Sequence, residues 1–218
     1  MKRRVAILIS GRGSNMTALI EAAQCSSFPA EIVLVVSNKA DASGLAKAAE
    51  AGIATATIES KSFRGDREAF ERALQAELTK HRVDLICLAG FMRVLTAWFV
   101  TQWEGHMINI HPALLPSFPG LHTHEQALAA GVKIHGATVH FVVKDVDAGP
   151  IIMQGAVAVR DDDTADTLAA RVLEVEHRIY PDALRLVAEG AVAVTGCVCR
   201  TKAAAGSPDD ALIVPSVI

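Results

Sequence analysis

Cysteine, tyrosine and tryptophan are scarce in this chain of 218 residues, which has four cysteines, one tyrosine and two tryptophans. The cysteines are scattered, at Cys25, Cys87, Cys197 and Cys199. They suggest no disulfide framework and favour a reducing compartment. No apolar stretch approaches the roughly 20 residues that a membrane-spanning helix needs. We therefore expect a cytoplasmic protein without a membrane partner.

An excess of basic residues is also missing, because 21 Lys and Arg face 24 Asp and Glu, for a formal charge of −3. The one tight basic cluster is 2–4, which leaves little for binding nucleic acid through its phosphates. The apolar run 5–9 is too short for a signal peptide. Hydrophobic residues make up 51% of the chain, enough for a sizeable core. We expect one domain over 1–200 and a flexible tail, rich in Ala, Gly, Ser and Pro, over 201–218.

Apolar runs alternate with helical patterns through the first half of the chain. Alternation of this kind predicts an α/β fold with a mostly parallel sheet, doubly wound by helices on both faces and Rossmann-like in its amino-terminal half. Ligands of such sheets bind at the carboxyl ends of the strands. The predicted strands are 5–10, 32–37, 53–58 and 83–89, and the predicted helices are 15–25, 43–51 and 66–81.

The second half changes character after a short predicted helix at 96–103 and strand at 107–110. Three prolines stiffen an irregular loop over 112–120, and a helix is predicted at 123–130. Strands at 137–143 and 151–159 are joined by a turn short enough for an antiparallel pair, which extends the parallel sheet. The pattern over 164–190 predicts a helix that Pro181 kinks or splits, with Asp161–Asp163 supplying capping oxygens.

Asn109 and His111 form the most informative pair of the sequence. They lie two residues apart after an apolar run and before Pro112, which favours extended backbone at His111. Side chains two apart in an extended chain point the same way. One neutral donor and one titratable donor therefore aim at a common point, which suits an oxygen that gains negative charge during a reaction.

The segment Gly11-Arg12-Gly13-Ser14-Asn15 follows the first predicted strand and opens the first predicted helix. Small residues and a helix amino end favour an anion. Met16 stands where a dinucleotide fingerprint needs its third glycine, and the second strand lacks a ribose-binding acid, so a single phosphate fits better. The alternative is a tight turn without a ligand.

Two further segments lie at predicted strand ends. Met92–Leu95 leaves the fourth strand and could line a slot for a flat heterocycle with a carboxylated tail, or could be core packing with one surface arginine. Asp147, in the turn after 137–143, could hold a water, orient an imidazolium or take a proton. Turns are often rich in Asp, and the residues alone give no reason to prefer Asp147 over Asp145.

Glu176 falls at the margin of the buried stripe of the last predicted helix. A carboxylate there should pair with a donor, either ligand hydroxyls or a neighbouring element. The histidines 111, 122, 124 and 140 invite a zinc site, but no recognised ligand spacing joins them, so we expect no metal.

Taken in order, these motifs resemble the phosphoribosylglycinamide formyltransferase family of folate-dependent enzymes. The resemblance runs from about residue 4 to 190 and is carried by 10–15, 37–41, 88–93, 109–116, 140–142 and 147–150. It implies transfer of a formyl group from 10-formyltetrahydrofolate, as co-substrate, to the amine of 5-phosphoribosylglycinamide, a step of one-carbon metabolism in de novo purine (IMP) biosynthesis. It implies small-molecule partners only and a monomer or homodimer.

The resemblance also implies residue roles. The catalytic set would be Asn109, His111 and Asp147. The phosphoribosyl substrate would be held by Gly13, Ser14 and Asn15 at its phosphate and by Glu176 at its ribose. The folate would contact Arg67, Met92, Arg93, Val94, Leu95, Val143, Lys144, Asp145 and Val146.

Asn109 and protonated His111 would donate to the oxygen of a tetrahedral intermediate, and Asp147 would move a proton from the amine to the leaving nitrogen. The loop 112–120 could act as a lid that excludes water. Two alternatives stay open. A formyltetrahydrofolate hydrolase would use water as the nucleophile, although such enzymes carry an additional amino-terminal domain that we do not expect before the strand at Val5. A non-catalytic binder of phosphate ligands would yield no product.

Overall fold

A computed structural model describes residues 1–202 and 212–214 of the chain. The chain divides into two compact units, Met1–Asn109 and Ile110–Ile218, and the division falls inside strand β5 (Met107–His111). Each unit is described here by itself. The expectation of one domain over 1–200 stays a prediction.

The first unit is built on a parallel sheet, as the sequence predicts. Its strands follow the spatial order β5-β4-β1-β2-β3, and every neighbouring pair is parallel. The strands are β1 (Arg3–Ile9), β2 (Ala30–Ser37), β3 (Ala54–Thr57), β4 (Leu85–Leu88) and β5. Residues 5–9 of β1 and all of β4 are buried, as expected for strands covered on both faces.

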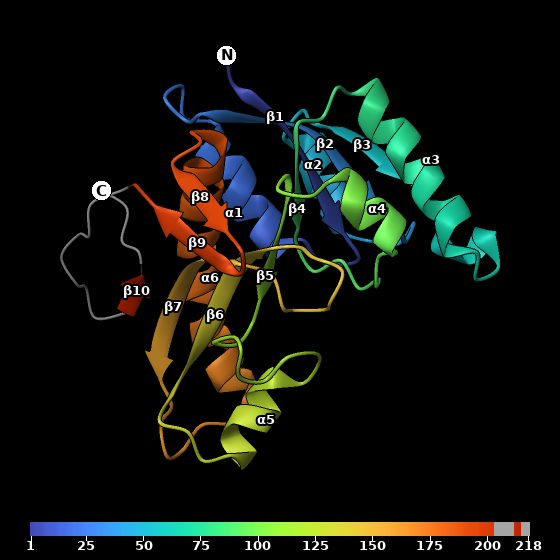
Figure 1. The fold of residues 1–218 in the computed structure, drawn as a ribbon. Helices are drawn as coiled ribbons and strands as arrows, with labels where there is room; N and C mark the ends of the chain where they lie inside the picture. Colours follow the sequence, from blue (N-terminus) through green and yellow to red (C-terminus); the bar gives the residue numbers. More distant parts are fainter. Residues whose placement is uncertain (203–211, 215–218) are drawn as a thin grey trace. The chain divides into compact units, whose positions relative to one another are not determined.

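The helices of this unit alternate with its strands along the chain (Figure 1). They are α1 (Ser14–Ala23), α2 (Gly44–Glu50), the 3₁₀ helix η1 (Ser60–Phe63), α3 (Arg67–Lys80) and α4 (Ala97–Gln102). Helix α1 packs against α2, and α3 packs against α4. Right-handed crossovers place the first pair on one face of the sheet and the second pair on the other, so the sheet is doubly wound.

The strand order reverses between β1 and β4. From β1 the chain adds β2 and β3 on one side, and then β4 and β5 on the other. In open parallel sheets the crevice at such a reversal is where ligands bind, outside the carboxyl ends of the strands. The segments that follow β1 and β4 therefore occupy the position that sheets of this type use for their substrates.

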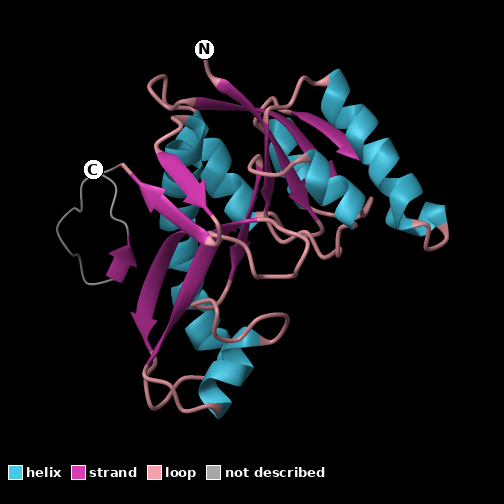
Figure 2. Cartoon of the chain, in the orientation of Figure 1, coloured by secondary structure: helices cyan, strands magenta, loops and turns pink. Residues whose placement is uncertain are grey.

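The second unit contains the antiparallel pair β6 (Ile134–Phe141) and β7 (Ile151–Ala158), as predicted, although β6 begins three residues earlier than expected. Helix α5 (Thr123–Ala129) precedes β6, and the long helix α6 (Ala165–Ala188) follows β7. Figure 2 shows α6 running along the pair. A Cβ atom at Gly155 of β7 would lie only 2.2 Å from a methyl carbon of Val175, so α6 packs directly on this strand.

Three features of the second unit differ from the sequence predictions. Pro181 lies inside α6 and does not split it. The N-cap of α6 is Thr164, paired with Thr167 in a capping box, and not one of Asp161–Asp163. A hairpin of β8 (Val192–Thr195) and β9 (Val198–Thr201) follows α6 where no strands were predicted, because four-residue strands with half-exposed side chains give little periodicity.

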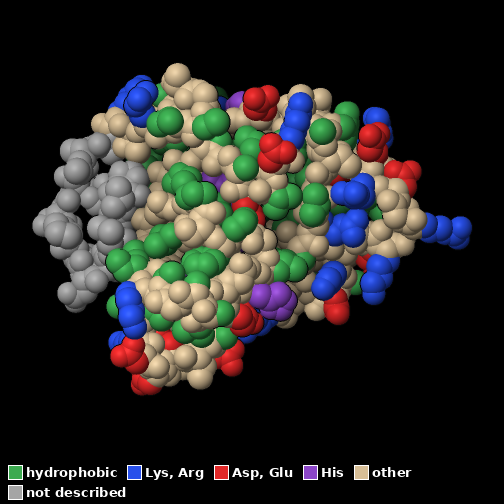
Figure 3. Space-filling view, turned by 60° about the horizontal axis from the view of Figure 1, so that its bottom comes forward, with side chains coloured by type: hydrophobic (Ala, Val, Ile, Leu, Met, Phe, Trp, Pro, Cys, Tyr) green, Lys and Arg blue, Asp and Glu red, His purple; other side chains and the backbone are tan. Residues whose placement is uncertain are grey.

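Most of the tail predicted as flexible, 203–211 and 215–218, lies outside the described residues. The described part of this tail includes β10 (Leu212–Val214), which pairs antiparallel with β7. No helix in the part of the chain that the structure describes is long and apolar enough to cross a membrane. On the face drawn in Figure 3, basic, acidic and hydrophobic side chains are interspersed.

Candidate active site

Two side chains that are 36 positions apart in the sequence meet in the second unit: His111, the last residue of β5, and Asp147, in the loop between β6 and β7. His111 Nδ1 lies 3.5 Å from Asp147 Oδ2, and only 5% and 9% of the two side chains are exposed. The two side chains predicted as partners therefore lie next to one another in a buried place, and their catalytic role stays a prediction.

The other ring nitrogen of His111, Nε2, faces a backbone carbonyl. Nε2 lies 2.9 Å from the carbonyl oxygen of Phe118, which can only accept a hydrogen bond. Nε2 therefore donates, and Nδ1 faces a carboxylate. Both ring nitrogens of His111 therefore face oxygen atoms.

Asp147 is held by its backbone as well as by its partners. Its φ is 56°, in the left-handed region that few residues other than glycine adopt, although Asp tolerates it. Its Oδ2 accepts the N–H of Gly120 at 2.9 Å. Two residues later, a Cβ atom at Gly149 would lie 1.7 Å from the carbonyl oxygen of Phe141, so only glycine lets the loop close tightly on the end of β6.

A second histidine flanks Asp147. His140 Nε2, from β6, lies 3.9 Å from Asp147 Oδ1, while its Nδ1 lies 2.8 Å from the carbonyl of Phe141 and donates to it. Burial lowers the pKa of His140, more than the nearby Asp147 raises it. His140 is therefore a neutral ring whose Nε2 lone pair faces the carboxylate. The sequence suggested no catalytic role for this histidine, which was considered as a metal ligand and belongs to a segment of the family resemblance.

The loop after His111 is anchored at its inner part by a buried polar network. Thr138 Oγ1 accepts the N–H of Leu115 at 3.0 Å and donates to the carbonyl of Ala113 at 2.6 Å. Gln154 Nε2 donates to Leu115 O at 2.9 Å and to Thr138 Oγ1 at 3.0 Å. Residues 116, 117 and 119–122, by contrast, are exposed. The loop therefore has a fixed root on β6 and β7 and an exposed outer part.

Asn109 precedes His111 by two residues in β5, and alternate side chains of a strand project from the same face. The extended geometry that Pro112 favours is observed, because β5 continues through His111. Asn109 and His111 thus lie on the same face of the strand, and their joint binding of a ligand oxygen stays a prediction.

In the first unit, the segment predicted to hold phosphate lies where β1 ends and α1 begins. Gly13 has φ 69° and is the N-cap of α1, whose first turn carries no acidic residue. The loop is tied to α2 by the N–H of Gly44, which donates to Gly11 O at 3.1 Å, and by Lys47 Nζ, 3.3 Å from Arg12 O. The amino end of α1 thus lies at the sheet reversal with its backbone N–H groups free of acidic neighbours in its first turn, and binding of a phosphate there stays a prediction.

The segment Met92–Leu95 lies against α3. Thr96 donates its backbone N–H to Glu71 Oε1 at 2.7 Å, and its hydroxyl bonds the other oxygen of the same carboxylate. The guanidinium of Arg93 lies 5.7 Å from the ring centroid of Phe70. Arg67 precedes Phe70 by three residues in α3, so the two lie on the same face of that helix. The side chains of Met92 and Val94, on either side of Arg93, are exposed.

Two buried polar residues of this region were missed by sequence reasoning, Ser10 and Glu71. Glu71 is 1% exposed on an otherwise apolar face of α3. Its burial could have been predicted, because this acidic residue stands next to the apolar stripe of Phe70, Leu74 and Leu78. Ser10 carries no such signal, since a serine at a strand end is common in turns.

The remaining predicted residues lie in the second unit. Glu176 is in the middle of α6 and 6% exposed, as its place at the margin of the apolar stripe predicts. Val143 to Val146 form the start of the loop that presents Asp147, and Val146 is 60% exposed. The structure thus brings together His111, Asp147 and His140, while the contacts of the predicted substrate-binding residues with ligands stay predictions.

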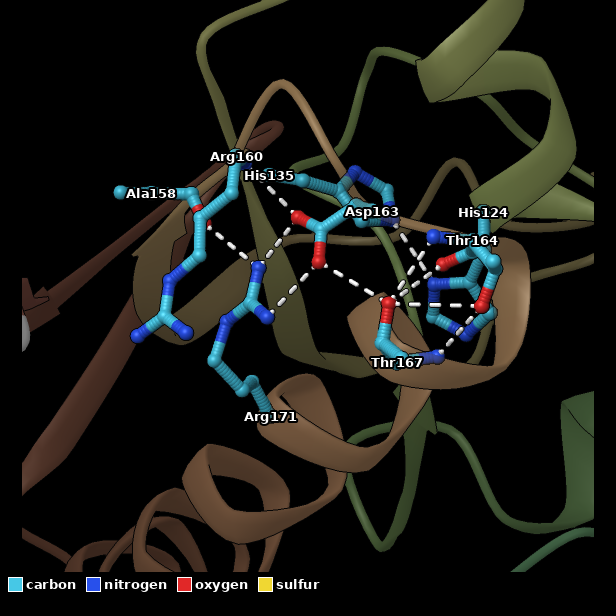
Figure 4. Close-up of polar contacts among 8 residues, drawn as sticks. All are labelled: His124, His135, Ala158, Arg160, Asp163, Thr164, Thr167 and Arg171. Carbon is cyan, nitrogen blue, oxygen red and sulfur yellow. Dashed lines mark hydrogen bonds and ion pairs between the residues drawn. The ribbon is translucent and has the colours of Figure 1, made fainter.

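Figure 4 shows two other polar groupings of this unit. His135 Nε2 and His124 Nδ1 lie 3.2 Å apart and share one hydrogen bond. Arg171 binds both carboxylate oxygens of Asp163, which also accepts the N–H of Arg160 at 2.7 Å. Within residues 1–202 and 212–214, no group of three or more His, Cys, Asp or Glu side chains is arranged to hold a metal ion.

Comparison with known proteins agrees with this geometry. The formyl transferase family model matches residues 3–184. Phosphoribosylglycinamide formyltransferase of Escherichia coli K12 is 46% identical over 186 residues, 85% of this chain and 87% of that protein. The crystal structure of phosphoribosylglycinamide formyltransferase from Brucella melitensis superposes with a TM-score of 0.83 at 56% identity, covering 89% of this chain and all of that one.

The trifunctional purine biosynthetic protein adenosine-3 of Bos taurus is 53% identical over 200 residues, which are 91% of this chain and 20% of that protein. The chain thus spans about a fifth of the length of such multidomain relatives. The fold and the match over most of the sequence agree, and this chain belongs to the formyl transferase family.

Proposed function

We propose that this chain is a phosphoribosylglycinamide formyltransferase, which moves the formyl group of 10-formyltetrahydrofolate to the amine of 5-phosphoribosylglycinamide in de novo purine biosynthesis. The names of the relatives support this activity. The observation that carries the proposal is the buried contact of 3.5 Å between His111 Nδ1 and Asp147 Oδ2. Asn109, in the same strand as His111, completes the proposed catalytic set.

In this proposal the phosphoribosyl substrate places its phosphate on Gly13, Ser14 and Asn15, at the amino end of α1. Glu176 receives the ribose hydroxyls. The folate lies along Met92–Leu95 and Val143–Val146, and its acidic tail meets Arg67. The exposed apolar side chains of Met92 and Val94, with Arg93 between them in the chain, support an elongated ligand that is flat and apolar at one end and anionic at the other.

The amine attacks the formyl carbon, and the electron pair of the carbonyl bond moves to the oxygen. Asn109 and the Nε2–H of His111 donate to this oxygen, and one such donor typically contributes about 10²–10³ in rate. The Nε2–H of His111 is bonded to the carbonyl of Phe118. In this proposal the outer part of the loop, 116–122, must release His111 before Nε2–H can donate to the substrate.

The intermediate collapses when the bond between the formyl carbon and the folate nitrogen breaks, and that nitrogen must gain the proton that the amine loses. Asp147 lies beside two imidazole rings, with its Oδ2 3.5 Å from His111 Nδ1 and its Oδ1 3.9 Å from His140 Nε2. The longer separation exceeds that of a direct hydrogen bond. Asp147 with a water would carry the proton, a step worth about 10²–10⁴ in rate.

The test is incubation of the protein with 10-formyltetrahydrofolate, with and without 5-phosphoribosylglycinamide, while tetrahydrofolate release is measured. Release that depends on the amine, with formylated product in equal amount, supports the transferase. Equal release without the amine identifies a hydrolase. Binding of the ligands without any release identifies a non-catalytic binder.

A further inference from the structure

One hydroxyl links three segments at the carboxyl ends of the parallel strands. Ser10 directly follows β1, Asn38 directly follows β2, and Met92 lies in the segment after β4. Ser10 Oγ lies 2.6 Å from Asn38 Oδ1, and the N–H of Met92 donates to Ser10 Oγ at 2.8 Å. The hydroxyl therefore spans the point at which the strand order reverses.

The direction of these two bonds is determined by chemistry. The backbone nitrogen of Met92 can only donate, so Ser10 Oγ accepts there. The amide oxygen of Asn38 can only accept, so Ser10 uses its single proton for it. Asn38 Nδ2 in turn lies 3.4 Å from Ser60 Oγ, which fixes the amide with its oxygen towards Ser10. The hydroxyl is thus oriented by Asn38 and holds the backbone at Met92.

Burial makes this arrangement costly to disrupt. Ser10 is 6% exposed and Asn38 is 5% exposed, so solvent cannot readily replace the hydroxyl. Met92, by contrast, is 63% exposed as a whole residue, although its N–H is bonded to Ser10. The backbone is fixed from inside the sheet while the side chain stays available at the surface.

We infer that Ser10 is a positioning residue that sets the folate-binding segment Met92–Leu95 against the phosphate loop at 11–15, which begins at the next residue. This inference rests on the proposed function, because it takes Met92–Leu95 as folate contacts. Ser10 touches neither reacting group. Its hydroxyl holds one end of a segment whose other end is fixed by the bonds of Thr96 to Glu71.

The test replaces Ser10 by alanine and uses Ser37→Ala as the matched control. Ser37 is also buried at a strand end, but its hydroxyl donates to Lys39 O at 2.8 Å and accepts the N–H of Lys39 at 3.1 Å, within its own turn. Both substitutions remove one buried hydroxyl, and only Ser10→Ala releases Met92. Asn38→Ala, which leaves the hydroxyl but removes its orienting partner, is a second variant.

Three measurements separate positioning from general stability: the Tm, the Kd for tetrahydrofolate by fluorescence, and hydrogen exchange of the Met92 amide. We expect Ser10→Ala to raise the Kd roughly three- to tenfold, the effect of one lost hydrogen bond. The exchange of the Met92 amide should rise, and the KM for 5-phosphoribosylglycinamide should stay within about twofold. Asn38→Ala should change the Kd in the same direction, whereas Ser37→Ala should change only the Tm.

A Kd for Ser10→Ala equal to that of Ser37→Ala would overturn the inference and leave the proposed function intact. Wild-type protein that binds tetrahydrofolate but transfers no formyl group would refute the function, while the comparison of Kd values would still decide the role of Ser10. Wild-type protein that binds no tetrahydrofolate would overturn both.

Discussion

Asp147 Oδ2 lies 3.5 Å from His111 Nδ1 and accepts the N–H of Gly120 at 2.9 Å with the same oxygen. The acid of the proposed catalytic pair therefore also holds the outer part of the loop that follows His111. Because Phe118, in the same loop, accepts from the other nitrogen of His111, the loop contacts both members of the pair. A movement of this loop would therefore change the hydrogen bonds of both His111 and Asp147.

The root of this loop gives a first prediction. Gln154→Met keeps the length of the side chain and removes its bonds to Leu115 and Thr138. We expect a loss of about 1 kcal/mol in the free energy of unfolding, together with a fall in kcat, since the loop carries His111 at its start. Urea unfolding and steady-state kinetics measure the two effects.

Gln126→Met is the matched control for Gln154. Gln126 Nε2 donates to Leu121 O at 2.6 Å in an exposed position at the outer part of the loop. Its loss should change stability by less than about 0.5 kcal/mol, as for most surface substitutions. A Gln154→Met protein with unchanged stability and kcat would show that the network does not anchor the loop.

The two histidines of Figure 4 predict acid sensitivity. Burial, and then the charge of His124, lowers the pKa of His135 to about 4 from the ordinary 6.5, and burial also lowers the pKa of His124. Between pH 6.5 and about 4 the unfolded chain binds a proton at this position and the folded chain does not. The free energy of unfolding should therefore fall as the pH drops through this range.

His135→Gln, which cannot titrate, tests this assignment. Urea midpoints at several pH values between 7.5 and 4.5 should show a shallower pH dependence for the variant than for the wild type. Equal slopes in the two proteins would place the acid sensitivity elsewhere.

The ion pair of Asp163 with Arg171 gives a prediction about stability alone. The Arg171 guanidinium holds the pKa of Asp163 well below its usual range. A carboxylate with a lowered pKa contributes stability above the unfolded value of 3.8 and loses it as the pH falls towards the folded value. Asp163→Asn should thus lower the Tm at pH 7, with kcat unchanged at 25 °C.

Repeating the Tm comparison for Asp163→Asn at lower pH supplies the check. The deficit against the wild type should persist at pH 5 and shrink only below about pH 4, where Asp163 of the unfolded wild type begins to protonate while the folded protein keeps the carboxylate ionised. A deficit that disappears already at pH 6 would contradict the assignment to Asp163.

The sequence predicted the parallel sheet well because β1 and β4 are buried on both faces, and such strands read as uninterrupted apolar runs. The pairing of His111 with Asp147 was predicted only through the family resemblance. From the residues alone, Asp147 and Asp145 were equivalent, because the left-handed φ of Asp147 and the tight closure at Gly149 depend on the packed loop.

Ser10 and His140 show what local patterns cannot supply. Ser10 gains its role from partners 28 and 82 residues away, and no periodicity encodes such contacts. His140 has a neutral ring because burial lowers its pKa, and burial of a single histidine in a strand follows only from the packed fold.

The N-cap of α6 was predicted at the wrong residue. Asp163 is a good capping residue, but its carboxylate is bonded to Arg171, and Thr164 caps the helix instead.

Whether His111 and Asp147 perform the chemistry as a pair is decided by the single-turnover rate of formyl transfer in Asp147→Asn. Asparagine keeps an oxygen that can accept the N–H of Gly120, and it removes the charge that faces His111. We expect a folded protein that still binds tetrahydrofolate and transfers at least about a hundredfold more slowly. A near-normal rate with a lowered Tm would show instead that Asp147 only shapes the turn.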